Sequence, residues 1–106
     1  MRLAIPLFGA RVSPRFDHAP RLLLLSVEEG KVVSREEMPL SPLALWQRVE
    51  RLKELQVDVV ICGGIDEGSK CWLLDHRIQV IPRIAGEAHR AVINFLAGRI
   101  KAPVGA

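Results

Sequence analysis

The sequence predicts an α/β fold, a three-layer sandwich around a mixed five-stranded sheet, and three observations support this. The chain has 106 residues, which is room for one domain, placed at residues 1–100 with residues 101–106 as a loose C-terminal tail. Its composition, 49% hydrophobic and 25% charged, is typical of a globular protein. Its apolar segments follow the order β-β-β-α-β-α-β-α, which combines an antiparallel meander with parallel crossovers.

Five segments have the pattern of strands. Residues 2–8 are apolar on both faces, which indicates a strand buried on both sides. Pro6 is a difficulty there, because proline donates no hydrogen bond and belongs at a sheet edge or a bulge. The other four predicted strands are residues 22–27 and 31–38, joined by a turn at Gly30, and the shorter segments 57–62 and 78–81.

Three segments have the pattern of helices. Ser41-Pro42 suits the start of the first, with serine as the cap and proline at the first helical position. Its inward stripe is Leu45, Val49 and Leu52. The side chains expected to face water are Gln47, Arg48, Glu50, Arg51, Lys53 and Glu54. Asp66 can cap a second helix that ends near Arg77, and residues 86–96 form the third.

Charge and cysteine content exclude several classes of protein. Fifteen lysines and arginines against twelve acids give a net charge of +3, without a run of like charges typical of nucleic-acid binders. No apolar run approaches the roughly 20 residues that span a bilayer, and no signal-peptide pattern is present. Two cysteines without CxxC spacing predict neither a disulfide framework nor a zinc site. We therefore expect a cytoplasmic protein with neither membrane nor nucleic-acid partners.

The layout predicts where a ligand binds. In open α/β sheets, ligands collect beyond the carboxyl ends of parallel strands, where the strand order switches. If strands 2–8 and 57–62 are parallel neighbours, the loops at residues 9–20 and 62–69 meet at that point. These two loops are therefore the predicted functional site. An exposed edge strand also makes a homodimer feasible.

The first of these loops carries the local concentration of arginine. It is longer than usual hairpin loops and is stiffened by two prolines, with Phe16 expected to anchor it by burial. Arg11, Arg15 and Arg21 surround a single Asp17, which is followed directly by His18. A carboxylate beside an imidazole can act as a base, a metal ligand or a hydrogen-bond clamp. The alternative is that His18 only caps backbone groups of its own loop.

The second loop joins a strand to a helix through Gly63 and Gly64. Paired glycines let the backbone approach a ligand, and free N–H groups at a helix start favour anions. No Lys-Ser/Thr pair follows, so the segment is not a phosphate-binding P-loop. A tight turn without a ligand remains the alternative interpretation.

Cys62 is expected at the rim of the crevice formed by these loops. A thiolate there would be a soft ligand for iron, copper or zinc, although buried free cysteines are also common in protein cores. Cys71 and His89 are interpreted as packing residues. No strand carries converging carboxylates for two-metal phosphoryl chemistry, and no GxSxG elbow is present, so conventional hydrolysis is not expected.

Three segments together resemble the dinitrogenase iron–molybdenum cofactor biosynthesis family. They are residues 4–6, the loop segment Val12–Ala19 with its Ser-x-x-Phe-Asp-x-Ala pattern, and residues 57–65 with the Gly-Gly turn. The resemblance covers about residues 1–100 in matching order. The chain departs from the family's pattern where many members carry His-Gly before the first helix, since it has Ser41-Pro42 there, and at Asp66 and Ser69, where glycine and alanine are usual.

The resemblance implies a ribonuclease-H-like fold without nuclease activity, in which the first strand is central and Pro6 occupies a bulge. It implies a non-enzymatic carrier of an anionic metal–sulfur cluster, iron–molybdenum or related, whose partners are metallocluster-assembly proteins. From the meeting of the two loops together with this resemblance, the candidate metal ligands are His18 and Cys62. The candidate cofactor-binding residues are Arg11, Ser13, Arg15, Asp17, His18, Cys62, Gly63 and Gly64. Two alternatives are a regulatory or interaction module that binds a small anion or a partner protein without metal, and an enzyme with an Asp17-His18 base dyad.

Overall fold

A computed structural model describes residues 1–102 and confirms the three-layer α/β sandwich. The sheet has the order β4-β3-β1-β5-β6, with β1 (Arg2–Phe8) at its centre. The strand β3 (Arg21–Glu28) runs antiparallel to β1, and β4 (Lys31–Pro39) runs antiparallel to β3, so that the three form a meander. The strands β5 (Val59–Ile61) and β6 (Gln79–Ile81) are parallel to β1. The expected tail at residues 101–106 lies mostly outside the described residues.

The predicted count of five strands is wrong by one short strand. Residues 11–12 turn back as β2 (Arg11–Val12) and pair with the end of β1 through the registers Leu7–Val12 and Phe8–Arg11. The turn is closed by Gly9, whose φ of 64° suits a residue without a Cβ. The first part of the long loop is therefore a hairpin on the central strand, which fixes where the rest of the loop starts.

The expected bulge at Pro6 is also wrong. The pairing of β1 with β3 runs in continuous register through the pair Pro6–Leu22. On its other side, β1 pairs with β5 only at Leu3 and Ala4, and beyond that point the Pro6 carbonyl accepts a hydrogen bond from the Ser13 N–H, at 2.8 Å. Proline is tolerated in this central strand because its missing N–H falls where β5 has ended and the loop begins.

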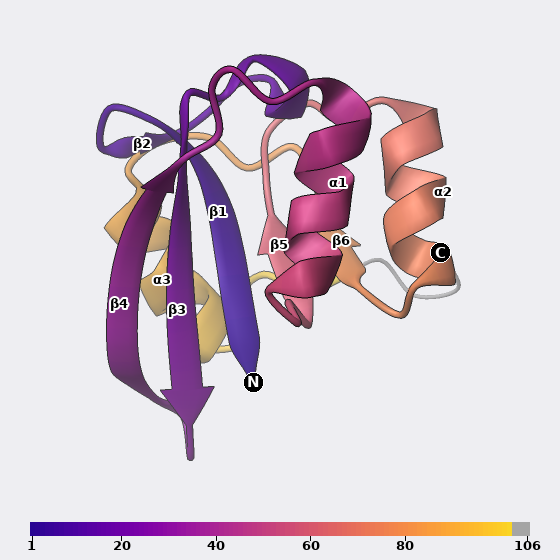
Figure 1. The fold of residues 1–106 in the computed structure, drawn as a ribbon. Coiled ribbons are helices and arrows are strands. Elements are labelled where there is room, and N and C mark those ends of the chain that lie inside the picture. Colours follow the sequence, from indigo (N-terminus) through magenta and orange to yellow (C-terminus); the bar gives the residue numbers. More distant parts are fainter. Residues whose placement is uncertain (103–106) are drawn as a thin grey trace.

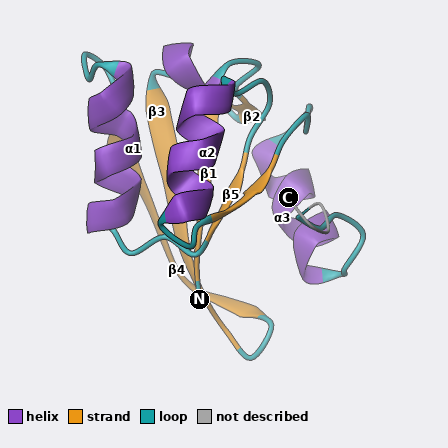
Figure 2. Cartoon of the chain, turned by 90° about the vertical axis from the view of Figure 1, so that its right-hand side faces the viewer, coloured by secondary structure: helices purple, strands orange, loops and turns teal. Residues whose placement is uncertain are grey.

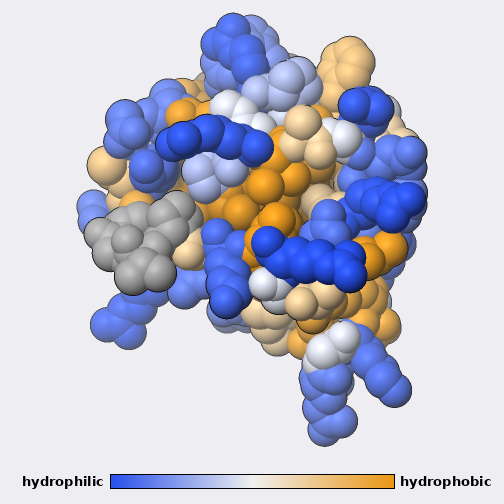
Figure 3. Space-filling view, turned by 180° about the vertical axis from the view of Figure 1, so that it is seen from behind, coloured by the Kyte–Doolittle hydropathy of each residue, from blue (hydrophilic) through white to orange (hydrophobic). Residues whose placement is uncertain are grey.

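Helices α1 (Leu45–Glu54) and α2 (Glu67–Asp75) cover one face of the sheet, and α3 (Ala88–Leu96) covers the other (Figures 1 and 2). The core is accordingly divided by the sheet into two buried clusters. The longest helix has ten residues, so none within residues 1–102 could cross a bilayer. On the side of α3, apolar surface remains visible between charged side chains (Figure 3).

Two helix starts differ from the sequence prediction. The first helix begins at Leu45 rather than at Pro42, and the Gln47 side chain accepts a hydrogen bond from the Ala44 N–H, at 2.7 Å. The third begins at Ala88 rather than at residue 86. The prediction for the second is confirmed, since the Asp66 carboxylate caps it by accepting from the Ser69 N–H at 2.9 Å.

Candidate functional site

Three loops, rather than the predicted two, meet at the carboxyl ends of β1, β5 and β6 (Figure 1). The two predicted loops join directly, because the Gly64 N–H donates to the Pro14 carbonyl at 2.7 Å and the Phe16 N–H donates to the Gly64 carbonyl at 2.8 Å. The third loop follows β6. Its Arg83 N–H donates to the Gly63 carbonyl at 3.0 Å. The diglycine segment thus lies between the other two loops.

Gly63 and Gly64 are required by close packing of the backbone. A Cβ atom on Gly63 would lie 2.5 Å from the Ser13 carbonyl oxygen, and one on Gly64 would lie 3.0 Å from the Pro14 carbonyl oxygen. The expectation that the Gly64 amide faces an anion is not met, because Pro14 already accepts its hydrogen bond. The glycines therefore join the loops, and the Gly64 N–H is not free to contact a ligand.

A buried layer holds the long loop in place. Phe16 lies in the core beneath the 3-10 helix η1 (Phe16–His18), as the sequence predicted, together with Ala19. Ser13 is also buried, and its hydroxyl donates to the Arg15 carbonyl at 2.9 Å. We call Ser13, Phe16, Ala19 and Gly63, with Arg48 described next, the buried layer of the site.

Arg48 was predicted to face water, and this is wrong. Its side chain is 5% exposed and turns beneath η1. Its guanidinium donates to the carbonyls of Ala19, Phe16 and Leu43, which bind the start of α1 to the loop. Burial lowers the pKa of Arg48, and the nearby charge of Asp17 opposes that effect. A helical wheel cannot find this residue, because the groups that bury it belong to a distant loop.

An exposed layer of charged side chains lies above the buried one, and consists of Arg11, Arg15, Asp17 and His18. Arg15 donates two hydrogen bonds to the Asp17 carboxylate, at 2.7 and 3.1 Å. Burial acts to raise the pKa of Asp17, but the hydrogen bonds and charge of Arg15, with the charge of His18, lower it overall. The His18 Nε2 atom lies 3.6 Å from the same carboxylate, which is too long for a hydrogen bond. Asp17 therefore orients Arg15, and it forms no hydrogen bond with His18 in this structure.

Cys62 does not lie at the rim of the crevice. Its side chain is fully buried in the cluster under α1 and α2, and burial raises the pKa of the thiol to about 12. A neutral, enclosed thiol lacks the thiolate form that binds metals. Within residues 1–102, no three His, Cys, Asp or Glu side chains are grouped closely enough to hold a metal ion.

Arg83 is the site residue that sequence reasoning missed. It is exposed, has a positive φ of 62°, and follows the third parallel strand. Its backbone contacts Gly63, while Arg15 forms a parallel bridge with Gly64, so these two arginines flank the diglycine. The signal was available in the topology, because the loop after β6 must emerge at the same edge as the loop after β5.

Cys71 and His76 belong to the α2 region, whereas His89 lies at the start of α3, next to the loop after β6. Cys71 is exposed on α2. His76 follows α2 and stacks on Trp72, with ring centroids 3.8 Å apart. His89 is half-exposed on α3, with Nδ1 3.2 Å from a Glu87 carboxylate oxygen.

The chain matches a known protein family. The family model described as "Dinitrogenase iron-molybdenum cofactor" matches residues 1–98. No match is found among curated protein sequences.

Solved structures share the fold at low sequence identity. A candidate dinitrogenase from Methanocaldococcus jannaschii is 15% identical, with a TM-score of 0.83, and the match covers 100% of this chain and 97% of that one. The apo form of the orange protein from Desulfovibrio gigas is 22% identical, with a TM-score of 0.80 and coverage of 98% and 93%. A protein from Thermotoga described as NifB-like is 22% identical, with a TM-score of 0.72 and coverage of 95% and 91%.

Proposed function

Because the chain belongs to the dinitrogenase iron–molybdenum cofactor family, we propose that it is a non-enzymatic carrier of an anionic metal–sulfur cluster, of the iron–molybdenum type or a related one. The observation that carries the proposal is the arrangement of three exposed arginines, Arg11, Arg15 and Arg83, on loops joined at the diglycine. The cargo passes between proteins, so its proposed partners are other metallocluster-assembly proteins.

The chemistry of such a cargo fits these residues. The metals of a metal–sulfur cluster already carry sulfide ligands, so a carrier needs positive charge and hydrogen-bond donors more than a complete set of protein ligands. Guanidinium groups supply both. His18, whose side chain is 68% exposed, is the ligand that we propose for direct contact with metal. Cys62 is assigned to core packing, because its thiol is buried and neutral.

The test is retention of the cargo by the purified protein. The protein would be incubated without oxygen with molybdate and sulfide, with iron in a second sample, and then desalted. We expect a visible absorption band and metal that co-elutes with the protein. The variant Arg11→Gln/Arg15→Gln should retain several-fold less metal, because charge-assisted contacts are lost.

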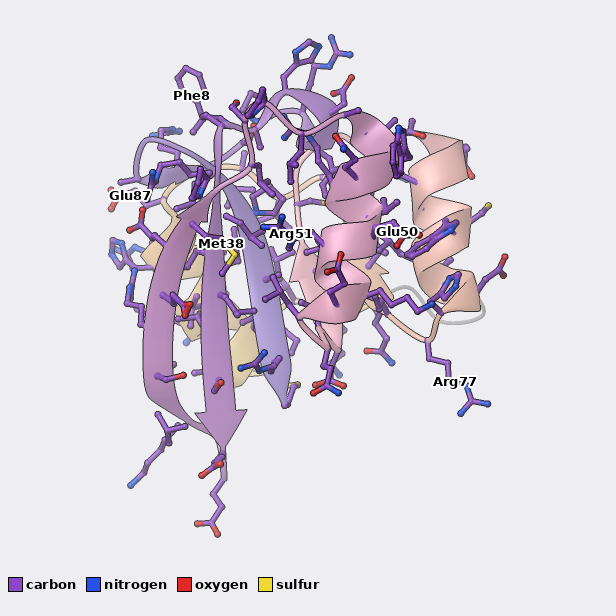
Figure 4. The ribbon with its side chains drawn as sticks, viewed as in Figure 1. Phe8, Met38, Glu50, Arg51, Arg77 and Glu87 are labelled. Carbon is purple, nitrogen blue, oxygen red and sulfur yellow. The ribbon has the colours of Figure 1, made fainter. Side chains whose placement is uncertain are left out.

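A control variant tests whether the loss of a positive charge far from the site also lowers metal retention. Arg77 lies at the opposite end of α2 from these loops (Figure 4), and Arg77→Asn removes a positive charge at a position whose φ of 63° asparagine tolerates. This variant should retain metal like the unaltered protein. Absence of metal in every sample, or equal losses in both variants, would overturn the proposal.

One observation favours a second candidate, a module that binds a small anion or a partner protein without metal. Of the two predicted metal ligands, Cys62 is buried and only His18 is exposed, so the site has few side chains for a metal. Its arginines can also bind oxyanions such as phosphate. A rise in melting temperature with inorganic phosphate, absent in Arg11→Gln/Arg15→Gln and unchanged in Cys62→Ala, would support this candidate by linkage of binding to stability.

A further inference from the structure

A groove between α1 and α2 has the composition of a binding site for a cation. It encloses about 440 Å³ and is lined mainly by apolar groups. Its walls include both tryptophans of the chain, Trp46 and Trp72. Trp46 is 67% exposed, which is unusual for the largest apolar side chain and is typical of residues that anchor protein interfaces.

The charged groups at the groove are carboxylates. Glu50 lies between the two helices (Figure 4), and Asp66 lies at the start of α2. None of the eight lining residues is Lys, Arg or His. Nearby cations have other partners, since Lys70 pairs with Glu67 at 3.7 Å and Arg48 donates to loop carbonyls. Within residues 1–102, Glu50 forms no ion pair of its own.

The tryptophan on α2 is held in a fixed orientation. His76 stacks on the Trp72 ring at a centroid distance of 3.8 Å, and its Nδ1 atom lies 2.8 Å from the Trp72 carbonyl oxygen. A ring that is already ordered loses little conformational entropy when it binds a ligand.

We propose that this groove binds the side chain of an arginine or lysine from a partner protein. The aliphatic stem of such a side chain would lie against Leu45 and Val49, because long cationic side chains cover apolar surface with their stems. Its cationic end would lie over an indole face, which attracts cations, and near the Glu50 carboxylate. A neutral apolar ligand would gain no attraction from that carboxylate, and an anion would be repelled by it.

The tryptophans themselves provide the measurement, because the chain has only two and both line the groove. The protein would be titrated with N-acetyl-arginine methylamide while intrinsic fluorescence is recorded. The matched probe is N-acetyl-citrulline methylamide, which has nearly the same shape without the charge. We expect a saturable change with the arginine probe and at least tenfold weaker binding of the citrulline probe.

Two variants test the part played by Glu50. Glu50→Gln should lower the affinity for the arginine probe about tenfold and leave the affinity for the citrulline probe unchanged. Glu54→Gln, one turn further along α1 and outside the groove lining, should bind both probes like the unaltered protein. A response without saturation, equal affinity for the two probes, or equal effects of the two variants would overturn the proposal. No metal is used, so the outcome is independent of the carrier function proposed above.

Discussion

The buried and exposed layers of the loop site differ in what holds them. In the buried layer, the Arg48 guanidinium donates to a carbonyl of η1 and Gly63 packs against Ser13 and Pro14, so contacts between distant parts of the chain hold these groups. In the exposed layer, Arg15 and Asp17 pair with each other, and Arg11 and His18 extend into solvent. Adjacent residues thus have different roles, because Phe16 anchors the loop by burial and Asp17 pairs with the charge of Arg15.

This difference predicts that stability and binding are separable. Substitutions in the buried layer should lower the free energy of unfolding by amounts typical of core changes, whereas those in the exposed layer should change ligand binding with little effect on folding. A buried-layer variant with unchanged stability would break the comparison.

The largest effect is expected for Arg48→Met. Methionine keeps much of the apolar stem but leaves three carbonyls without a charged donor, and hydrogen bonds of this kind contribute about 1.5–3 kcal/mol each, without simple additivity. We expect a loss of about 2–4 kcal/mol in the free energy of unfolding, measured by denaturant titration. Arg51→Met is the control, because Arg51 lies one turn away on α1 and donates none of the hydrogen bonds that hold the loop (Figure 4). An equal loss in both variants would contradict the role assigned to Arg48.

Gly63→Ala comes next. The new methyl group would lie 2.5 Å from the Ser13 carbonyl oxygen, a backbone atom that cannot move alone. Overpacking of this kind costs about 1–3 kcal/mol. Gly68→Ala is the control, since its Cβ would meet only the Asp66 carboxylate, at 3.3 Å, within a helix where alanine is favoured. The thermal midpoint should fall in the first variant and stay or rise in the second.

Burial of the Cys62 thiol should make the free energy of unfolding depend on pH, with a smaller effect than the two substitutions above. The unfolded thiol ionises near pH 8.5, whereas the folded thiol stays protonated up to about pH 12. The contribution of the protonated Cys62 thiol to the free energy of unfolding is therefore fully present below pH 8.5. It is lost as pH rises from about 8.5 to about 12, by up to about 1.4 kcal/mol per pH unit. Denaturant titrations at pH 8 and pH 10 should show a steeper loss in the unaltered protein than in Cys62→Ala. Cys71→Ala, which removes an exposed thiol, should keep the steep loss.

The sequence was informative about the buried strands and the position of the site. Continuous apolar segments and the diglycine placed the loops after β1 and β5 correctly, because a strand's polarity fixes which end of the sheet its loop occupies. The local hydrophobic pattern was uninformative where the burial of a residue depends on segments that are distant in the sequence. Arg48 has a polar position on its helix, and Cys62 lies at the carboxyl end of a parallel strand, where a crevice was expected, yet both are enclosed by packing that only the assembled fold provides.

Asp17→Asn should have the smallest effect on the free energy of unfolding, and it should also change the binding of an anion. The Arg15–Asp17 pair is at the surface, where such pairs contribute about 0–1 kcal/mol. Because the folded-state pKa of Asp17 is lowered, its contribution is present at neutral pH and is lost as pH falls through and below the usual aspartate value near 3.9. The difference in unfolding free energy between the two proteins should therefore shrink toward pH 3.

At neutral pH the variant frees Arg15 and removes a negative charge, so an anion should bind it a few-fold more tightly, measured by calorimetry with inorganic phosphate. Weaker phosphate binding would mean that Asp17 is needed to aim Arg15 at its ligand, and that the exposed layer is ordered more like the buried one.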